Sequence, residues 1–178
     1  MKLAFTDTNL EAGGWTAGPI YVRNLVQAVR CADASTGVYT LPLAGSDGAV
    51  EWARSLGADG VIWHQPPARW RRDWAIAWAA RRLRRDTLPI EWTLRRAGIE
   101  VVFSFPSPHP FGDIPTLGWL PDLQHVHLPE LFCAAERTRR DQTLRASVEL
   151  TDRLIAMSDA LVQDFLTFAP EYAYKVRV

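Results

Sequence analysis

Two histidines and two carboxylates are concentrated in one short stretch of the sequence, residues 119–130, which reads WLPDLQHVHLPE. The stretch contains His125 and His127, two of the four histidines of the chain, together with Asp122. An imidazole at this position can orient a hydroxyl or a phosphate, and a neighbouring carboxylate can accept a hydrogen bond from it. These three side chains are the candidate catalytic residues.

Two other interpretations of the same histidines stay open at this point. His-x-His with nearby carboxylates can form a zinc site, but such a site needs at least three protein ligands. The sequence has no separate cluster of histidines and cysteines to supply the rest, so no metal is expected. The histidines can also be structural, capping a loop or a helix.

A second candidate segment is the glycine-containing stretch 7–18, DTNLEAGGWTAG. Gly13 and Gly14 would let backbone amides approach a phosphate at the start of a helix. Their spacing is not the G-x-G-x-x-G of dinucleotide folds, and no P-loop lysine follows, which disfavours a nicotinamide enzyme and predicts no cofactor. The alternative is a flexible turn that needs positive φ.

The elements that must position these residues alternate between short apolar runs and longer stretches with helical periodicity. The expected strands are 2–6, 37–43, 60–64, 99–105, 116–120, 153–157 and 175–178. The expected helices start near Pro19 and cover 49–56, 70–85, 89–98, 130–150 and 159–168. This order predicts an α/β fold, a Rossmann-like three-layer domain with a mostly parallel sheet.

Ligands of such folds bind beyond the carboxyl ends of the strands, and the loops 7–18 and 121–129 both follow strands. We therefore expect both loops at the same edge of the sheet. That arrangement would bring Gly13 and Gly14 near Asp122, His125 or His127.

The composition limits the class of protein. The chain has 178 residues, 48% hydrophobic, with 20 basic and 20 acidic side chains, which fits a single globular domain and excludes a disordered chain. Zero net charge argues against a nucleic-acid partner. No apolar run is long enough to cross a membrane, and Cys31 and Cys133 form no disulfide framework. A cytoplasmic location is expected.

The segment 69–96 is locally rich in arginine and tryptophan. In a helix over residues 70–85, one side would carry Trp70, Trp74, Trp78, Arg81 and Arg85. A face of this kind suits a lipid surface, which would make the protein peripheral at the inner membrane surface. The alternative is that the tryptophans pack internally and the arginines are solvated.

Three stretches in the second half of the chain, WLPDLQHVHLPELFCAAERTRRD, RLIAMSDALVQDF and APEYAYKVRV, together resemble the N-terminal domain of GT-B-fold retaining glycosyltransferases of family four. The first matches a W-[IL]-P-D-[FL]-Q-H-x-H-L-P-E-[FL]-F signature of one subgroup. The early pattern G-G-x-x-x-G-x-x-Y-x-x-N-L also resembles the first loop and helix of that family. The resemblance covers most of the chain and is weakest over residues 44–98.

The resemblance implies a two-domain enzyme that transfers a sugar from a nucleotide-sugar donor to an acceptor with retained configuration. In such enzymes the N-terminal domain binds the sugar or glycolipid acceptor, and a C-terminal domain with a Glu-x7-Glu motif binds the donor. The sequence stops at KVRV, where the first domain of the family ends. The 178 residues are therefore expected to be the acceptor-binding half, inactive alone, without the donor-binding domain.

The resemblance also implies roles for individual residues. Gly13 and Gly14 match the loop that faces the donor phosphates. His125 most nearly matches the cleft histidine of the family, with His127 as second choice. Many members of the family carry a His-Asp pair at the positions of Pro121 and Asp122, so a proline stands here in place of the usual histidine. The candidates for acceptor binding are Trp15, Tyr21, Asn24 and Gln124.

Ser158 matches a serine that caps a late helix of the family.

An alternative of a different class is a stand-alone Rossmann-like binding or regulatory module that keeps the fold without catalysis. A gene that continues past Val178 into a further α/β domain would favour the enzyme over this alternative.

Overall fold

A computed structural model of the protein describes residues 1–6, 17–42, 48–64, 88–104 and 111–178. The chain divides into two compact units, the first made of residues 1–102 and 111–114, the second of residues 103–110 and 115–178. Three of the candidate residues, Gly13, Gly14 and Trp15, lie outside the described residues, as does the expected helix 70–85 with its tryptophans and arginines. Whether the chain behaves as a single domain stays a prediction.

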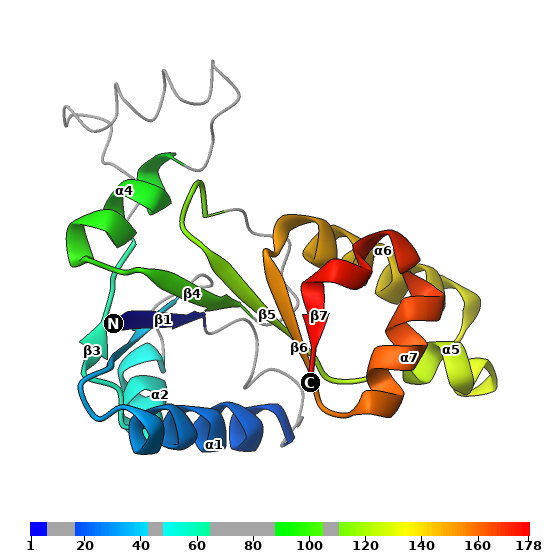
Figure 1. Ribbon diagram of the computed structural model, residues 1–178, viewed down its shortest axis with the longest axis horizontal. Coiled ribbons are helices and arrows are strands. Elements are labelled where there is room, and N and C mark those ends of the chain that lie inside the picture. Colours follow the sequence, from blue (N-terminus) through cyan, green and yellow to red (C-terminus); the bar gives the residue numbers. More distant parts are fainter. Residues whose placement is uncertain (7–16, 43–47, 65–87, 105–110) are drawn as a thin grey trace. The chain divides into compact units, whose positions relative to one another are not determined.

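Strands in the described ranges form a parallel sheet, which confirms the expected α/β, Rossmann-like class. Their hydrogen-bonding order is β3-β2-β1-β4-β5-β6-β7, and β4 contributes residues to both units (Figure 1). The strands are β1 (Lys2–Thr6), β2 (Gly37–Leu41), β3 (Gly60–Val61), β4 (Val101–Ser104), β5 (Thr116–Leu120), β6 (Arg153–Ala156) and β7 (Val176–Arg177).

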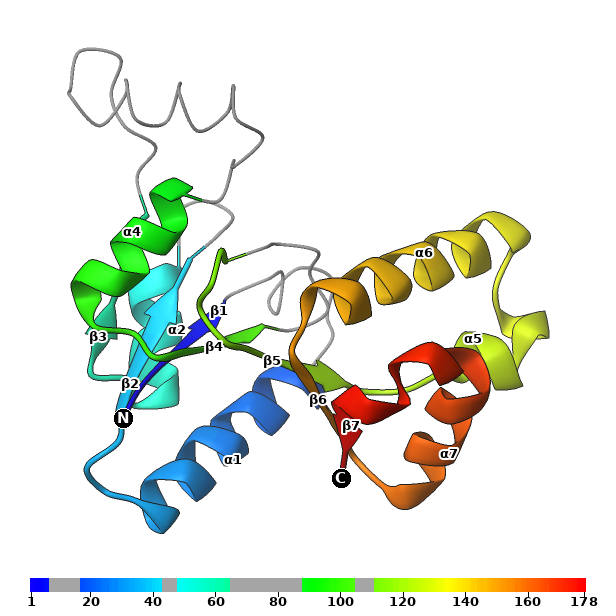
Figure 2. The same cartoon turned by 45° about the horizontal axis from the view of Figure 1, so that its top comes forward.

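The first unit carries helices on both faces of its strands. They are α1 (Ala17–Ala32), α2 (Ala49–Leu56) and α4 (Leu88–Ala97). Helix α4 buries Leu94 against Ala4 and Leu41 of the strands. Helix α1 lies on the opposite side of these strands from α4 (Figures 1 and 2), and it buries Val22 and Val26 at helical spacing. Two layers of helix therefore enclose the strands of this unit.

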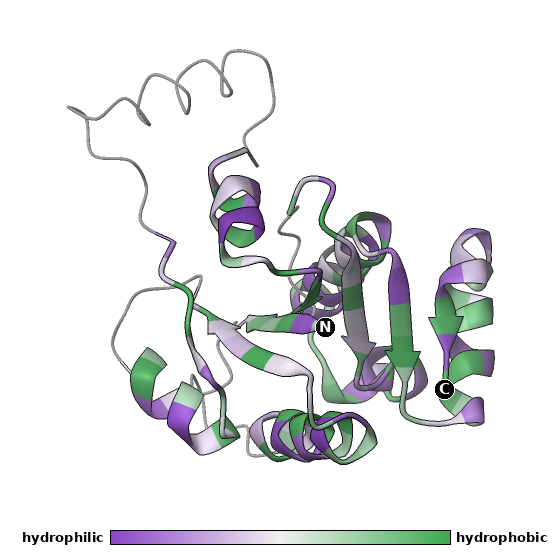
Figure 3. Ribbon diagram, turned by 60° about the vertical axis from the view of Figure 1, so that its left-hand side comes forward, coloured by the Kyte–Doolittle hydropathy of each residue, from purple (hydrophilic) through white to green (hydrophobic). Residues whose placement is uncertain are grey.

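The second unit packs its helices and strands into one core. The helices are α5 (Gln124–His127), α6 (Ala134–Leu150) and α7 (Asp159–Phe168), with 3₁₀ helices at Pro129–Leu131 and Pro170–Lys175. The core combines Leu144 and Val148 of α6 with Phe165 of α7. Hydrophobic and hydrophilic residues alternate along the helices, as bands of both colours in Figure 3 show. Helix α7 buries Leu161 and Phe165, whereas α6 is largely hydrophilic and buries Leu144, Ser147 and Val148 near its C-terminal end.

The buried side chain of Lys175 caps the C-terminal end of α6. Its ammonium group donates hydrogen bonds to the carbonyls of Val148 (2.9 Å) and Glu149 (3.0 Å), which the helix itself leaves without partners. Burial lowers the pKa of this ammonium group. The side chain therefore joins the entry of β7 to the last turn of α6.

Several expected elements have the expected bounds, namely those at 2–6, 49–56, 116–120 and 159–168. Strand β2 ends at Leu41 rather than Leu43, because Pro42 has no N–H to donate to a ladder. The helix expected from Glu130 begins only at Ala134, after the separate 3₁₀ turn. The expected loop 121–129 contains the helical turn α5. No helix in the described parts of the chain is both long and apolar enough to cross a membrane.

Candidate functional site

Within residues 119–130, the chain forms a helical turn, α5, shortly after the end of β5. The Asp122 carboxylate accepts a hydrogen bond from the backbone N–H of Gln124 at 3.2 Å, which fixes the chain where α5 begins. Leu123 is buried in the core of the second unit and anchors the same turn. Asp122 thus organises the backbone that presents the histidines.

His125 is almost completely buried, with 5% of its surface exposed. Its Nε2 lies 2.9 Å from Oδ1 of Asp141 on α6. The ring packs edge-on against Phe132 and Phe168, with centroid distances of 6.4 and 6.3 Å. Asp141 therefore holds the imidazole in one orientation between two aromatic rings.

His127 binds a different helix. Its Nε2 lies 2.9 Å from Oδ2 of Asp164 on α7, and its side chain is 56% exposed. The two histidines, two residues apart, thus attach α5 to α6 through Asp141 and to α7 through Asp164. We refer to these two pairs together as the histidine clasp.

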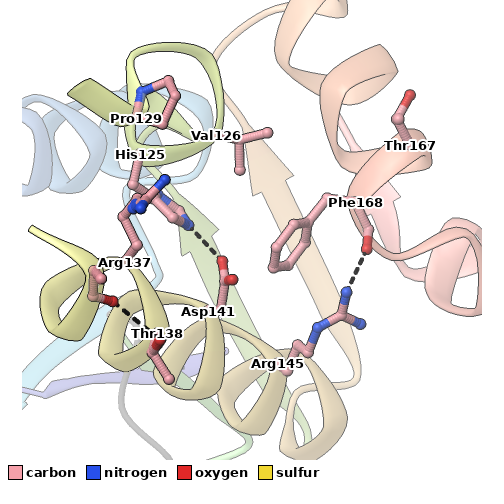
Figure 4. A pocket seen from close by; sticks show the side chains of 10 residues that line it. His125, Val126, Pro129, Arg137, Thr138, Asp141, Arg145, Thr167 and Phe168 are labelled. Carbon is pink, nitrogen blue, oxygen red and sulfur yellow. Dashed lines mark hydrogen bonds and ion pairs between the residues drawn. The ribbon is translucent and has the colours of Figure 1, made fainter. Parts of the chain in front are cut away.

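A pocket of about 590 Å³ opens beside the buried histidine (Figure 4). Helix α6 supplies Arg137, Asp141 and Arg145, which share one face because they lie four residues apart. Ala134 and Thr138 of α6 also line the pocket, together with His125, Val126 and Pro129 from α5 and the turn after it and Thr167 and Phe168 from the end of α7. We call this space the α6 pocket.

The charged groups of the α6 pocket differ in how they are paired. Arg145 lies over the ring of Phe168 at 4.5 Å, donates to the Phe168 carbonyl at 2.8 Å and pairs with Glu171 at 3.3 Å. Asp141 is engaged by His125. Arg137 is a half-buried residue, and its guanidinium has no ion-pair partner among the described residues. Nδ1 of His125 is buried and likewise has no hydrogen-bond partner in the described part of the chain.

The remaining sequence-predicted residues lie elsewhere in the structure. Tyr21 and Asn24 are on α1 of the first unit, Tyr21 half-buried and Asn24 exposed. Burial raises the pKa of the Tyr21 phenol. Gln124 is exposed on α5. The expected approach of loop 7–18 to loop 121–129 involves residues 7–16, which lie outside the described residues, so it stays a prediction.

The expected histidine partner needs correcting. The sequence suggested Asp122, whose carboxylate instead receives the Gln124 backbone, while the aspartates that meet the two rings are Asp141 and Asp164. Both lie on later helices, and local spacing does not predict such long-range contacts. The sequence does indicate that Arg137, Asp141 and Arg145 share one helix face, because they recur at four-residue spacing.

The zinc alternative gains no support from the geometry. In the described ranges, no group of three or more histidine, cysteine, aspartate or glutamate side chains is arranged to hold a metal ion. The two histidines point their Nε2 atoms to aspartates on different helices rather than to a common centre.

No protein-family model matches the sequence, and a search of curated proteins finds no match either.

Proposed function

We propose that the protein is the acceptor-binding half of a retaining glycosyltransferase that uses a nucleotide-sugar donor. The observation that carries the proposal is the position of the WLPDLQHVHLPE stretch. It begins with the last two residues of β5 in a parallel sheet and continues beyond the carboxyl end of that strand, and its His125 forms part of the wall of the α6 pocket. The carboxyl end of a strand in such a sheet is where ligands of α/β proteins bind.

The chemistry of sugar transfer divides naturally between two halves. The departing phosphate must be stabilised, which is the task of the donor-binding half. The acceptor hydroxyl must be held at the anomeric carbon, which requires rigid positioning rather than a strong base. His125 suits a positioning role because Asp141 and two phenylalanine rings fix its orientation.

The test compares the 178-residue chain with the protein extended by whatever its gene encodes after Val178. Each is incubated with nucleotide-sugars and candidate sugar or glycolipid acceptors, and NMR reads the anomeric configuration of any product. The extended protein should transfer sugar with retention, and the chain alone should not, because one wall of a cleft cannot hold both reactants. Transfer by the chain alone, or an inverted product, would contradict the proposal.

A second candidate is a binding or regulatory module without catalysis. The observation that favours it is that both imidazoles are already engaged by aspartates, as structural histidines would be. In an extended protein that transfers sugar, His125→Gln should lower transfer far more than it lowers acceptor binding if the enzyme proposal is right. Unchanged transfer would assign the histidine clasp to structure alone.

A further inference from the structure

Arg137 is the charged side chain of the α6 pocket for which the described residues provide no ion-pair partner. The other charged groups that line the pocket have partners, since Asp141 meets His125 and Arg145 meets Glu171. Arg137 is half-buried and has no ion-pair partner among the residues that the structure describes. A guanidinium presents a planar fork of donors that matches the oxygens of a phosphate.

The two threonines of the α6 pocket indicate a second feature of the ligand. The Thr138 hydroxyl donates to the Ala134 carbonyl at 3.0 Å, and the Thr167 hydroxyl donates to the Gln163 carbonyl at 3.2 Å. With their protons used in this way, both oxygens have lone pairs left to accept hydrogen bonds. Groups that donate to such oxygens include the hydroxyls of a sugar or another polyol.

The space and its shape set the size of the ligand. A volume of about 590 Å³ lies in the range that holds a small organic molecule. In Figure 4, Arg137 and His125 lie on one side of the lining residues, Phe168 and Arg145 lie on the other, and Asp141 lies between them. A hexose with one phosphate has a suitable size for it.

We propose that the α6 pocket binds a phosphorylated sugar or polyol, with Arg137 receiving the phosphate and the threonine oxygens receiving hydroxyls. The identification of this ligand as the acceptor rests on the proposed function. The same chemistry can come from a soluble sugar phosphate or from the headgroup of a phosphoinositide lipid. Ligand binding to the α6 pocket is measured without any sugar transfer. A failure of this binding proposal can therefore be distinguished from a failure of the proposed glycosyltransferase function.

The soluble source is tested by isothermal titration of the 178-residue chain with glucose 1-phosphate, inorganic phosphate and glucose. Glucose 1-phosphate should bind most tightly, and Arg137→Ala should weaken it by about tenfold or more, as expected for a charge-assisted hydrogen bond. Arg137→Lys should recover part of the affinity, because it keeps the charge but loses the fork.

The matched control is Arg139→Ala on the same helix. Arg139 is 71% exposed and lies 4.0 Å from Glu136, and it does not line the α6 pocket. Its replacement removes the same charge from α6, so it should leave glucose 1-phosphate binding unchanged within about twofold, since a surface charge contributes little. An equal loss in both alanine variants would mean a general charge effect and would overturn the proposal.

The lipid source is tested by co-sedimentation with vesicles of phosphatidylcholine, with and without phosphatidylinositol. Vesicle binding that requires both phosphatidylinositol and Arg137 supports the proposal with a lipid headgroup as the ligand. Binding of glucose 1-phosphate without binding to these vesicles supports the proposal with a soluble sugar phosphate as the ligand. If neither probe binds the wild-type chain, or if binding survives in Arg137→Ala, the pocket does not have this function. Circular dichroism of each variant verifies that it is folded.

Discussion

The two histidines of α5 have different surroundings although a single residue separates them. His125 is buried between Phe132 and Phe168, whereas more than half of the His127 side chain is exposed. A hydrogen bond shielded from water contributes more to stability than an exposed ion pair does. The His125–Asp141 pair should therefore supply most of the stability of the histidine clasp.

Replacing His125 with alanine should lower the free energy of unfolding by about 2–4 kcal/mol, because it removes a hydrogen bond and leaves a cavity between two rings. The matched variant His127→Ala should lower it by about 0.5 kcal/mol, as is usual for an exposed pair. Urea denaturation followed by circular dichroism measures both values. Equal losses would show that burial does not distinguish the two pairs.

Asp33, in the turn between α1 and β2, makes a pH-dependent contribution to stability. Hydrogen bonds from the hydroxyl and backbone N–H of Ser35, and from the Thr36 hydroxyl, lower the pKa of its carboxyl from 3.8 to about 2. In the unfolded chain the carboxyl takes up its proton near the ordinary pKa. The contribution is therefore complete above about pH 4 and is lost as the pH falls toward about 2.

An NMR titration of the Asp33 carboxyl should give a midpoint near 2 in the wild type. Ser35→Ala should move this midpoint upward, because it removes the largest single cause of the shift. Thr36→Val should move it less. A wild-type midpoint in the ordinary range of aspartate would refute the assignment.

At the level of elements, helix α7 could be predicted with its bounds because its signals are local. The Ser158 hydroxyl accepts a hydrogen bond from the Leu161 N–H at 3.2 Å and caps the start, as expected. Leu161 and Phe165 then recur at the spacing of a buried helix face. Where the capping residue and the hydrophobic periodicity agree, the sequence is sufficient to predict a helix and its bounds.

Helix α5 could not be predicted in this way. Its four residues are too few to show a helical period, and it is held by Asp141 and Asp164, which are distant in the sequence. Likewise, the four-residue spacing of Arg137 and Asp141 on α6 predicts a shared face but not a pocket above it. Long-range packing decides such features, and single-sequence spacing carries little information about it.

Two glycines with positive φ allow backbone strain to be separated from crowding. Gly57 ends α2 with φ of +67°, and an added Cβ would meet nothing within 4 Å. Gly112 has φ of +68°, and an added Cβ would collide with the Glu91 side chain. Glu91 has little freedom to move away, because it is 12% exposed and pairs with Arg95 at 2.8 Å.

Gly57→Ala should therefore lower the free energy of unfolding by about 1 kcal/mol, the usual strain of a left-handed residue. Gly112→Ala should lower it by about 3 kcal/mol or more, because overpacking adds to the same strain. Urea denaturation of the two variants gives the difference directly. Similar values for both would mean that Glu91 moves aside at no cost.

At the scale of the whole molecule, each unit contains a cluster of buried hydrophobic residues. One is built around Ala4, Leu94 and Val102 of the first unit, and another around Leu120, Val148 and Phe165 of the second. These two clusters have no residue in common among those that the structure describes. The histidine clasp and the α6 pocket belong entirely to the second unit. The proposed binding activity therefore depends first on the stability of that unit.

The placement of these clusters predicts how the chain responds to a cavity in either cluster. Leu94→Ala and Phe165→Ala each remove a completely buried side chain, and each should lower stability by about 2–5 kcal/mol. Because each of these side chains lies in a cluster confined to one unit, Leu94→Ala should accelerate amide hydrogen exchange mainly in β1 and β2, and Phe165→Ala mainly in β6. Exchange is read residue by residue by NMR in native buffer. A uniform acceleration across all strands in both variants would instead show that the chain unfolds as the single cooperative domain expected from its length.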